Sequence, residues 1–485
     1  LHPVAHSFPT RRSSDLTAGY IVDYLRGDRS REIANGGVFR DRESLLSDVV
    51  HASPVPYRWD SDQPGVIFVG ANDGMLHVLD ETTGNERFAY VPNLVYANLN
   101  ELTIDPYVHK YFVDSEPYIA KLGASGSTIL VGGLGRGGRG YYCLDISDVD
   151  DPALDAETNA TSIVKWEYPA NSDPEDKTVD PDMGYSFSQA YAVNSAAGWV
   201  VIFGNGYDSQ NGEAVLYVLR INSDGSLVSP TPAKIRTYVG DSGPNCNGLS
   251  TPALIDVNLD GLVDFAFAGD LLGNMWKFDL RDSNVNNWTV AYNELADGTG
   301  LPQPLFQARN ASGFRQPITT RPDIMRPCTA GRDGYFVLFG TGRYLGVEDF
   351  ADAGSIQSLY GIWDWAEDWE NLSPLTSADR RNATAKYLGY FDTNRQLSNL
   401  VANPDIPDTD QTLYVIDLSG AAYGDTVTIN TRTFTAASLT DVANREFLGT
   451  AGLQAAIEDA TYGVPDVSVE VSPTQVILRT DPPGG

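Results

Sequence analysis

Short apolar runs recur along the chain, and each is followed by a Gly, Asp or Asn turn and a second apolar run. Paired runs of this kind predict β-hairpins, because successive side chains of a strand point to opposite faces. Turns such as Asn72-Asp73-Gly74 and Gly273-Asn274 have the residues that tight hairpin loops require. The hairpin units occupy residues 66–80, 128–146, 200–221, 264–280 and 335–346, and the last is followed by a strand pattern at 357–365.

The spacing of these hairpins predicts how they assemble. They begin roughly 60–70 residues apart, which leaves room for outer strands and long loops in each unit. Repeated hairpins of this length close most readily into a β-propeller. The predicted fold is therefore all-β, a modified propeller, and the alternative is a sandwich of unrelated hairpins.

The two ends of the chain depart from the hairpin pattern. Residues 1–16 follow no secondary-structure period and resemble translated adapter sequence, so we treat them as non-native. After Leu418 the chain shows a polar hairpin, a helical spacing through Leu453, Ala456 and Ile457, and a return to strand. We therefore predict a propeller domain over 17–420 and a small α+β module, inserted or appended, over 421–482. The stretches rich in Asp, Pro and Asn, at 147–184 and 402–411, are predicted to be exposed loops.

Composition narrows the possible partners and chemistry. The net charge is −31, and 47 of the 64 acidic residues are Asp, which is typical of turns and of loops that bind hard cations. So negative a chain is not expected to bind nucleic acid through a general basic face. It has no CxxC pair, no paired-histidine motif and no run of 18 apolar residues. Any metal site should therefore use oxygen ligands, and no transmembrane helix is expected.

The three cysteines, Cys143, Cys246 and Cys328, are far apart in the sequence. In an oxidising compartment they allow one disulfide and leave one thiol. We predict a bridge between Cys246 and Cys328 and a buried Cys143. The other two pairings remain open.

One stretch has the pattern of a cation-binding loop. In Asp256-Val257-Asn258-Leu259-Asp260-Gly261-Leu262-Val263-Asp264, oxygen side chains stand at positions 1, 3, 5 and 9, and Gly stands at position 6. Ca²⁺ takes six to eight hard oxygens at about 2.3–2.6 Å, and the Gly permits a sharp bend. We expect Asp256, Asn258, Asp260, Asp264 and the carbonyl of Leu262 to bind Ca²⁺, with Val257, Leu259 and Val263 packed inward. The alternative is a turn rich in Asp and Asn between two strands.

Two further motifs have a functional and a structural interpretation. Arg26-Gly27-Asp28 is a candidate receptor-binding tripeptide of the integrin-docking type, or else a turn after a short helix. Trp276, Trp363, Trp365 and Trp369 are candidates for an exposed recognition patch, but aromatic residues on strands more often form the core.

The residues around the cation-binding loop resemble a known family. The stretch TPALIDVNLDGLVDFAFAGDLLGNMWKFDL closely resembles the C-terminal domain of the PilY family of type IV pilus tip-associated adhesin and biogenesis factors. Other stretches follow in the family's order, among them YLRGDRSRE, VIFVGANDGMLHVLD, MGYSFSQAYAV and GTGRYLG. The resemblance covers about residues 17–365.

This resemblance implies a calcium-binding propeller of about seven blades. Matched position by position, the family's calcium ligands fall on Asp256, Asn258, Asp260, the Leu262 carbonyl and Asp264. The resemblance also implies pilus assembly, control of extension and retraction and thus of twitching motility, and adhesion to host or abiotic surfaces. The expected partners are minor pilins and the assembly machinery. The expected place is the pilus tip (the fimbrium) or the cell surface, in association with the outer membrane.

An enzyme of the quinoprotein dehydrogenase type is the competing interpretation, because DGMLHVLDETTGNERFAYV resembles one blade of such propellers. Those enzymes pair a quinone and Ca²⁺ with adjacent cysteines, and no two cysteines are adjacent here. A nucleophile elbow is also absent from the sequence. A generic integrin-like scaffold would carry calcium loops in successive blades, whereas this sequence has one. We therefore predict a non-enzymatic protein.

Overall fold

The computed structural model describes most of the chain up to residue 364 and shorter segments after it. The two compact units of the chain are residues 1–305 with 316–384, and residues 306–315 with 385–485. The described residues are 13–59, 64–148, 160–170, 173–293, 302–310, 314–326, 334–346, 349, 357–364, 390–391, 397–398, 413–417, 426–429, 432–438, 446–458, 467–471 and 475–480.

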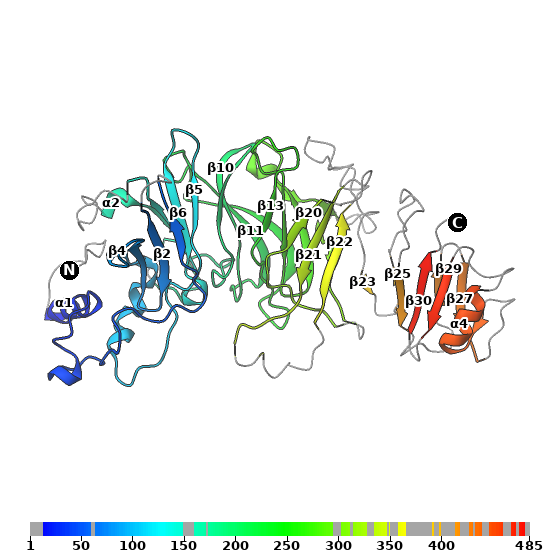
Figure 1. Ribbon diagram of the computed structural model, residues 1–485, viewed down its shortest axis with the longest axis horizontal. Helices are drawn as coiled ribbons and strands as arrows, with labels where there is room; N and C mark the ends of the chain where they lie inside the picture. The colour runs from blue at the N-terminus through cyan, green and yellow to red at the C-terminus, as the bar shows by residue number, and fades with distance from the viewer. Residues whose placement is uncertain are drawn as a thin grey trace. The chain divides into compact units, whose positions relative to one another are not determined.

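The first unit is built from antiparallel sheets in which consecutive strands are neighbours (Figure 1). The first sheet contains β1 (Val55–Tyr57), β2 (Val66–Ala71), β3 (Met75–Asp80) and β4 (Glu86–Tyr90). The second contains β5 (Tyr118–Lys121), β6 (Thr128–Gly133), β7 (Tyr141–Asp145) and β8 (Val164–Tyr168). The third contains β9 (Tyr191–Ser195), β10 (Gly198–Gly204), β11 (Glu213–Arg220) and β12 (Ala233–Gly240). The fourth contains β13 (Ala253–Ile255), β14 (Phe265–Gly269), β15 (Asn274–Asp279) and β16 (Thr289–Val290).

Shorter elements complete this unit. A fifth sheet of three described strands contains β20 (Asp323–Met325), β21 (Tyr335–Gly340) and β22 (Leu359–Asp364), and a small sheet pairs β17 (Tyr292–Asn293) with β18 (Pro302–Gln303). The helical elements are α1 (Ser13–Leu25), η1 (Ile33–Asn35), η2 (Asn93–Thr103), η3 (Gly135–Gly137), α2 (Ala160–Ile163) and η6 (Val285–Asn287). Helix α1 begins inside the segment that we had set aside as non-native, whose residues 1–12 lie outside the described part.

All five predicted hairpins are present. The turns Asn72-Asp73-Gly74 and Gly273-Asn274 join β2 to β3 and β14 to β15, and both glycines have positive φ (92° and 81°). Strand β21 pairs with β22, as the strand pattern at 357–365 predicted. The expectation of an all-β fold with local hairpins is therefore confirmed.

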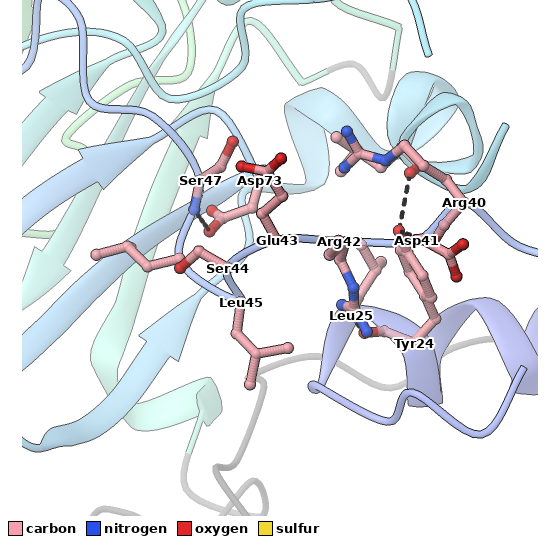
Figure 2. Close-up of a pocket in the computed structure, with 12 residues that line it drawn as sticks. Tyr24, Leu25, Arg40, Asp41, Arg42, Glu43, Ser44, Leu45, Ser47 and Asp73 are labelled. Atoms are coloured by element: carbon pink, nitrogen blue, oxygen red, sulfur yellow. Dashed lines mark hydrogen bonds between the residues drawn. The ribbon is translucent and has the colours of Figure 1, made fainter. Parts of the chain in front are cut away.

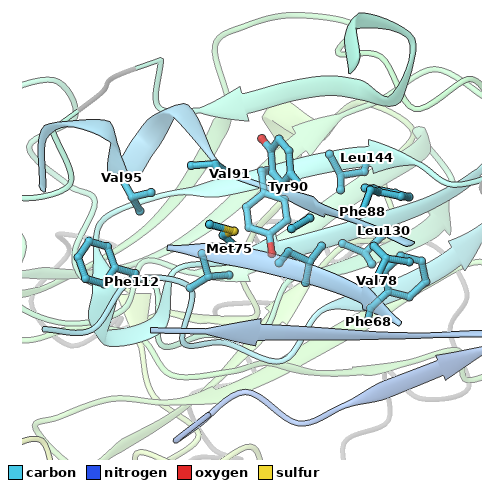
Figure 3. Packing of buried hydrophobic residues seen from close by; sticks show 14 of the residues in the cluster. Phe68, Met75, Val78, Phe88, Tyr90, Val91, Val95, Phe112, Leu130 and Leu144 are labelled. Carbon is cyan, nitrogen blue, oxygen red and sulfur yellow. The ribbon is translucent and has the colours of Figure 1, made fainter. Parts of the chain in front are cut away.

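Both faces of the middle strands are buried, and this determines how the sheets stack. In β10, Val200 and Ile202 pack with Trp276 and other residues of the fourth sheet. Val201 and Phe203, which alternate with them, pack with the second sheet. A third cluster joins the first and second sheets and includes Phe68, Tyr90 and Leu144 (Figure 3). Each sheet thus packs face to face against the next, as propeller blades do, instead of exposing one face to solvent.

The second unit contains two small sheets and a helix. Strand β25 (Leu413–Asp417) pairs with β30 (Gln475–Thr480), which pairs with β29 (Val467–Val471). The second sheet contains β26 (Thr426–Ile429), β27 (Arg432–Ala436) and β28 (Glu446–Phe447), and α4 (Gly449–Glu458) contacts both sheets. This unit also includes β19 (Phe306–Gln307) and the pair β23 (Tyr390–Phe391) and β24 (Leu397–Ser398).

The predicted local elements of the α+β module are present. Leu453, Ala456 and Ile457 are fully buried on one side of α4, which confirms the helical spacing. The strand segment after the helix is a hairpin of β29 and β30. The boundary proposed at residue 420 stays a prediction.

Candidate functional site

The predicted calcium loop, Asp256 to Asp264, joins β13 to β14 in the fourth sheet. Gly261 has a φ of +85°, a left-handed conformation that strongly favours glycine. Leu259 also has a positive φ, +61°, and its side chain is 79% exposed, so the expectation that it packs inward is wrong. A left-handed residue at the tip of the loop turns its side chain outward, whereas Val263 is buried as expected.

The polar side chains of the loop are turned toward its own backbone. Asp256 Oδ2 accepts a hydrogen bond from the Gly261 N–H at 2.7 Å, and Asp260 Oδ1 accepts one from the Leu262 N–H at 2.8 Å. Asn258 Oδ1 accepts from the Asp260 N–H at 3.0 Å, and Asp264 Oδ2 accepts from the Val257 N–H at 2.8 Å. These bonds bend the chain so that all four predicted oxygen side chains belong to one compact loop.

The electrostatics of the loop favour a cation. Burial raises the pKa of Asp264, and the negative charges of Asp256 and Asp260 raise it further. Asp256 and Asp260 are therefore close enough to repel the charge of Asp264, and a divalent cation would relieve that repulsion. Across the described ranges, no three acidic, His or Cys side chains form a preassembled metal cluster. The side-chain oxygens and the carbonyl of the loop are the kind of ligand that Ca²⁺ prefers, so the donor chemistry of these residues fits that ion.

Neighbouring blades hold the loop on both sides. The Val263 N–H donates to the Asn194 carbonyl in the third sheet at 2.9 Å. Arg326, which follows β20 of the fifth sheet, donates from Nη2 to the Val257 carbonyl at 2.9 Å. The position of the loop therefore depends on the packing of three consecutive sheets.

The Arg26-Gly27-Asp28 tripeptide forms a turn directly after α1. The Gly27 N–H donates to the Tyr24 carbonyl at 2.9 Å, and Gly27 has a φ of +99°. Asp28 is exposed, and its carboxylate accepts from the N–H and the hydroxyl of Ser30 at 2.7 and 2.9 Å. These two bonds lower the pKa of Asp28. The structural interpretation as a turn after a helix is thus correct, and receptor binding stays a prediction.

A pocket of about 280 Å³ lies beside this turn (Figure 2). The Ser47 N–H donates to Asp73 Oδ2 at 3.1 Å on one side of it, and the Tyr24 hydroxyl donates to the Arg40 carbonyl at 3.2 Å on the other. Its lining residues are Tyr24, Leu25, Arg40, Asp41, Arg42, Glu43, Ser44, Leu45, Leu46, Ser47, Asp73 and Leu102. Because four separate segments contribute, no local sequence pattern could have indicated it.

Comparison with known proteins identifies the family. The family model of the PilY1 beta-propeller domain matches residues 59–382. The chain belongs to the PilY1 propeller family. A type IV pilus biogenesis factor PilY1 homolog of Xylella fastidiosa is 36% identical over 455 residues, which cover 84% of this chain and 29% of that protein. A PilY1 protein of Pseudomonas aeruginosa is 33% identical over 439 residues, covering 81% of this chain and 35% of its own length.

A solved structure supports the same PilY1 assignment. The crystal structure of the Pseudomonas aeruginosa PilY1 C-terminal domain is 34% identical in sequence and has a TM-score of 0.50. The match covers 66% of this chain and 60% of that one. This chain spans about a third of the length of the curated PilY1 relatives that it matches.

The PilY1 relatives also bear on the competing enzyme interpretation, because they are named as biogenesis factors and not as enzymes. The quinohemoprotein alcohol dehydrogenase of Comamonas testosteroni is 13% identical with a TM-score of 0.31, and covers 57% of this chain and 42% of its own. That likeness is too distant to carry an argument about activity. In the part of the chain that the structure describes, no helix is long and apolar enough to cross a membrane.

The cysteines of this PilY1 propeller correct one expectation. Cys143 is fully buried, as predicted, and burial raises the pKa of its thiol. Cys246 is a half-buried free thiol, so the predicted bridge from Cys246 is wrong. Its intended partner, Cys328, lies outside the described residues. Sequence spacing alone does not show which strands and loops are adjacent, and disulfides require Cα atoms within about 7 Å.

The structure describes the side chain of one of the four tryptophans that were candidates for a recognition patch. Trp276 is fully buried between the third and fourth sheets, which confirms the core interpretation for that residue. Trp365, Trp369 and the side chain of Trp363 lie outside the described part of the chain.

Proposed function

We propose that this chain is the calcium-binding propeller region of a type IV pilus assembly and adhesion factor. It acts at the pilus tip or cell surface, where it regulates pilus extension and retraction and surface attachment. The observation that carries this proposal is the match to the PilY1 propeller over residues 59–382, which contains the loop from Asp256 to Asp264. The named role of the relatives in pilus biogenesis supports it.

The calcium loop is the proposed regulatory element. Asp256, Asn258, Asp260, Asp264 and the Leu262 carbonyl would hold the ion, whose positive charge would offset the repulsion of Asp264 by Asp256 and Asp260. The carbonyl of Leu262 accepts no hydrogen bond from the described residues and is available as a ligand. Asn194 and Arg326 connect the loop to the sheets on either side. A loop made more rigid by a bound ion would therefore also make the junctions between these blades more rigid.

The proposed partners follow from the role in the pilus. They are minor pilins and the assembly machinery, with host or abiotic surfaces as attachment targets. The exposed turn at Arg26 to Asp28 is a candidate contact for such a surface. A chain of net charge −31 does not favour nucleic acid as a partner.

The experiment replaces Asp264 by Ala in the full-length gene of the source bacterium. Asp282→Ala is the matched control, because Asp282 is a partly exposed aspartate that accepts hydrogen bonds from the Asn284 N–H and from Asn287 Nδ2 in its own turn outside the loop. Calorimetry on the purified chain should show one Ca²⁺ site, which Mg²⁺ at equal concentration does not fill. Asp264→Ala should lose this site, and the control should keep it. We expect twitching motility to change only in Asp264→Ala, at normal secreted amounts of protein.

Each outcome bears on a separate part of the proposal. Lost Ca²⁺ binding with unchanged motility contradicts the regulatory role of the ion. Tight Mg²⁺ binding, or no Ca²⁺ uptake by the unaltered protein, contradicts the metal assignment. Normal piliation and motility after deletion of the gene contradict the role in the pilus itself.

A further inference from the structure

Three aromatic side chains stand in a row on the connection between the first and second sheets. Tyr107, His109 and Tyr111 alternate along an extended segment, so their side chains lie on one side of it. The ring centres of Tyr107 and His109 are 6.3 Å apart, and those of His109 and Tyr111 are 4.8 Å apart. The rings meet edge to face, at 71° and 82°.

An arginine closes each end of this row. The guanidinium carbon of Arg40 lies 3.8 Å from the ring centre of Tyr107, and that of Arg136 lies 4.9 Å from the ring centre of Tyr111. Arg40 comes from the segment after η1, and Arg136 comes from the turn between β6 and β7. We call Arg40, Tyr107, His109, Tyr111 and Arg136 the aromatic row.

The charges of the row are unusual for so acidic a chain. Neither Arg40 nor Arg136 forms an ion pair with any described carboxylate, although the net charge of the chain is −31. The other basic groups around the row are engaged. His109 Nε2 contacts Asp48 Oδ2 at 2.9 Å, and Lys110 Nζ contacts Glu101 Oε1 at 2.7 Å. Two unpaired guanidinium groups therefore stand at the two ends of an aromatic surface.

Apolar surface is exposed beside the row. Val49 and Val50 are 39% and 49% exposed, and they lie between Asp48, which contacts His109, and His51, which contacts Asp114. At its other end the row meets the pocket of Figure 2, which Arg40 lines together with Tyr24, Leu25 and Leu102. Half-exposed tyrosines, arginines and valines together have the composition of interface centres, where tyrosine and arginine are enriched.

We propose that the aromatic row is a docking surface for an acidic segment of a partner protein. The guanidinium groups of Arg40 and Arg136 would pair with two carboxylates of that segment, because a guanidinium stacked on a ring keeps N–H groups at its edge for a carboxylate. In Arg40 these would be the terminal N–H groups, since its Nε is buried. Apolar side chains between the two carboxylates would contact Tyr107, Tyr111 and the neighbouring valines. The consecutive spacings limit the row to at most about 20 Å, which a seven-residue extended peptide can span. This inference goes beyond the calcium loop and does not depend on it.

The test measures binding of synthetic heptapeptides to the full chain by fluorescence anisotropy. The probe has Glu at both ends and Val, Thr and Tyr between them, and a second peptide has Gln in place of both Glu residues. The double variant carries both Arg40→Gln and Arg136→Gln, and the control variant carries Arg31→Gln. Arg31 is a matched control because its guanidinium carbon also lies over a tyrosine, 3.1 Å from the ring centre of Tyr20, and outside the row. Melting temperatures of all variants check the fold.

We expect the Glu-ended peptide to bind the unaltered chain and the Arg31→Gln control equally, and the double variant at least tenfold more weakly. The Gln-ended peptide should bind the unaltered chain at least tenfold more weakly than the Glu-ended one. No binding of the Glu-ended peptide at about 1 mM overturns the proposal. Equal affinity for both peptides, or an equal loss in the control, also overturns it. If heparin binds better than the peptide and all three arginines contribute alike, the surface attracts polyanions in general and the proposal is wrong.

Discussion

His77 offers the sharpest test of the electrostatics of the first blade. Its side chain is 5% exposed and lies between two carboxylates, with Nδ1 2.6 Å from Glu86 Oε2 and Nε2 3.1 Å from Asp73 Oδ1. Burial lowers the pKa of His77, but the charges and hydrogen bonds of Asp73 and Glu86 outweigh burial and raise the pKa from 6.5 to about 10. The imidazole is therefore charged at neutral pH.

This shift predicts a dependence of stability on pH. A group whose pKa is higher in the folded than in the unfolded protein stabilises the fold fully below its unfolded pKa, here 6.5. The stabilisation is lost as the pH rises from 6.5 toward 10, with a limiting slope of about 1.4 kcal/mol per pH unit. Over this window the total is of the order of 5 kcal/mol.

The variant His77→Gln keeps a similar volume and removes the titrating charge. Urea unfolding should show it less stable than the unaltered chain at pH 6, with the difference shrinking steadily toward pH 10. His109→Gln is the control, because His109 is 42% exposed in its contact with Asp48 and an exposed ion pair contributes at most about 1 kcal/mol. A difference between His77→Gln and the unaltered chain that stays constant from pH 6 to pH 10 refutes the charged histidine.

Two further predictions concern buried carboxylates. Asp182 pairs with Lys234 Nζ at 2.9 Å and with Arg236 Nη2 at 2.5 Å, and although burial opposes it, the bonds from Arg236, Asn211 and Lys234 lower the pKa of Asp182 to about 2. This contribution to stability is present above pH 3.8 and is lost as the pH falls toward 2. In Asp182→Asn, the free energy of unfolding should therefore fall less steeply with decreasing pH over this range than in the unaltered chain. An unchanged slope contradicts the assignment. Asp270 is fully buried and accepts from Asn274 Nδ2 and Trp276 Nε1, both at 2.8 Å. Asp270→Asn places an amide donor against these donors and should lower the free energy of unfolding by about 3 kcal/mol, measured by thermal unfolding. A loss below about 1 kcal/mol would show that the hydrogen bonds around residue 270 can rearrange.

Local features of the sequence predicted local structure well. The hairpins were recognisable because strand periodicity and turn residues act over a few positions, as at Asn72-Asp73-Gly74. The runs around Val200 to Phe203 are apolar at every position, which reflects burial of both faces between blades. The helix α4 followed from the spacing of Leu453, Ala456 and Ile457. The predicted calcium loop was recognisable as a motif because its expected ligands all come from one nine-residue stretch.

Contacts between distant segments could not be predicted in this way. Arg40, Tyr107 and Arg136 come from three segments, and only the packing of the first two sheets brings them into one row. Arg326 reaches the calcium loop from the next sheet, and Leu259 turns outward because of its left-handed backbone. The sequence by itself determined the hairpins, their turns and one helix, since those depend on neighbours along the chain. It did not reveal β8, which lies within the stretch 147–184 that was expected to be an exposed loop and buries Trp166 beside β7. The tertiary structure decided which charges are paired and which side chains share a surface, because those depend on how the sheets stack.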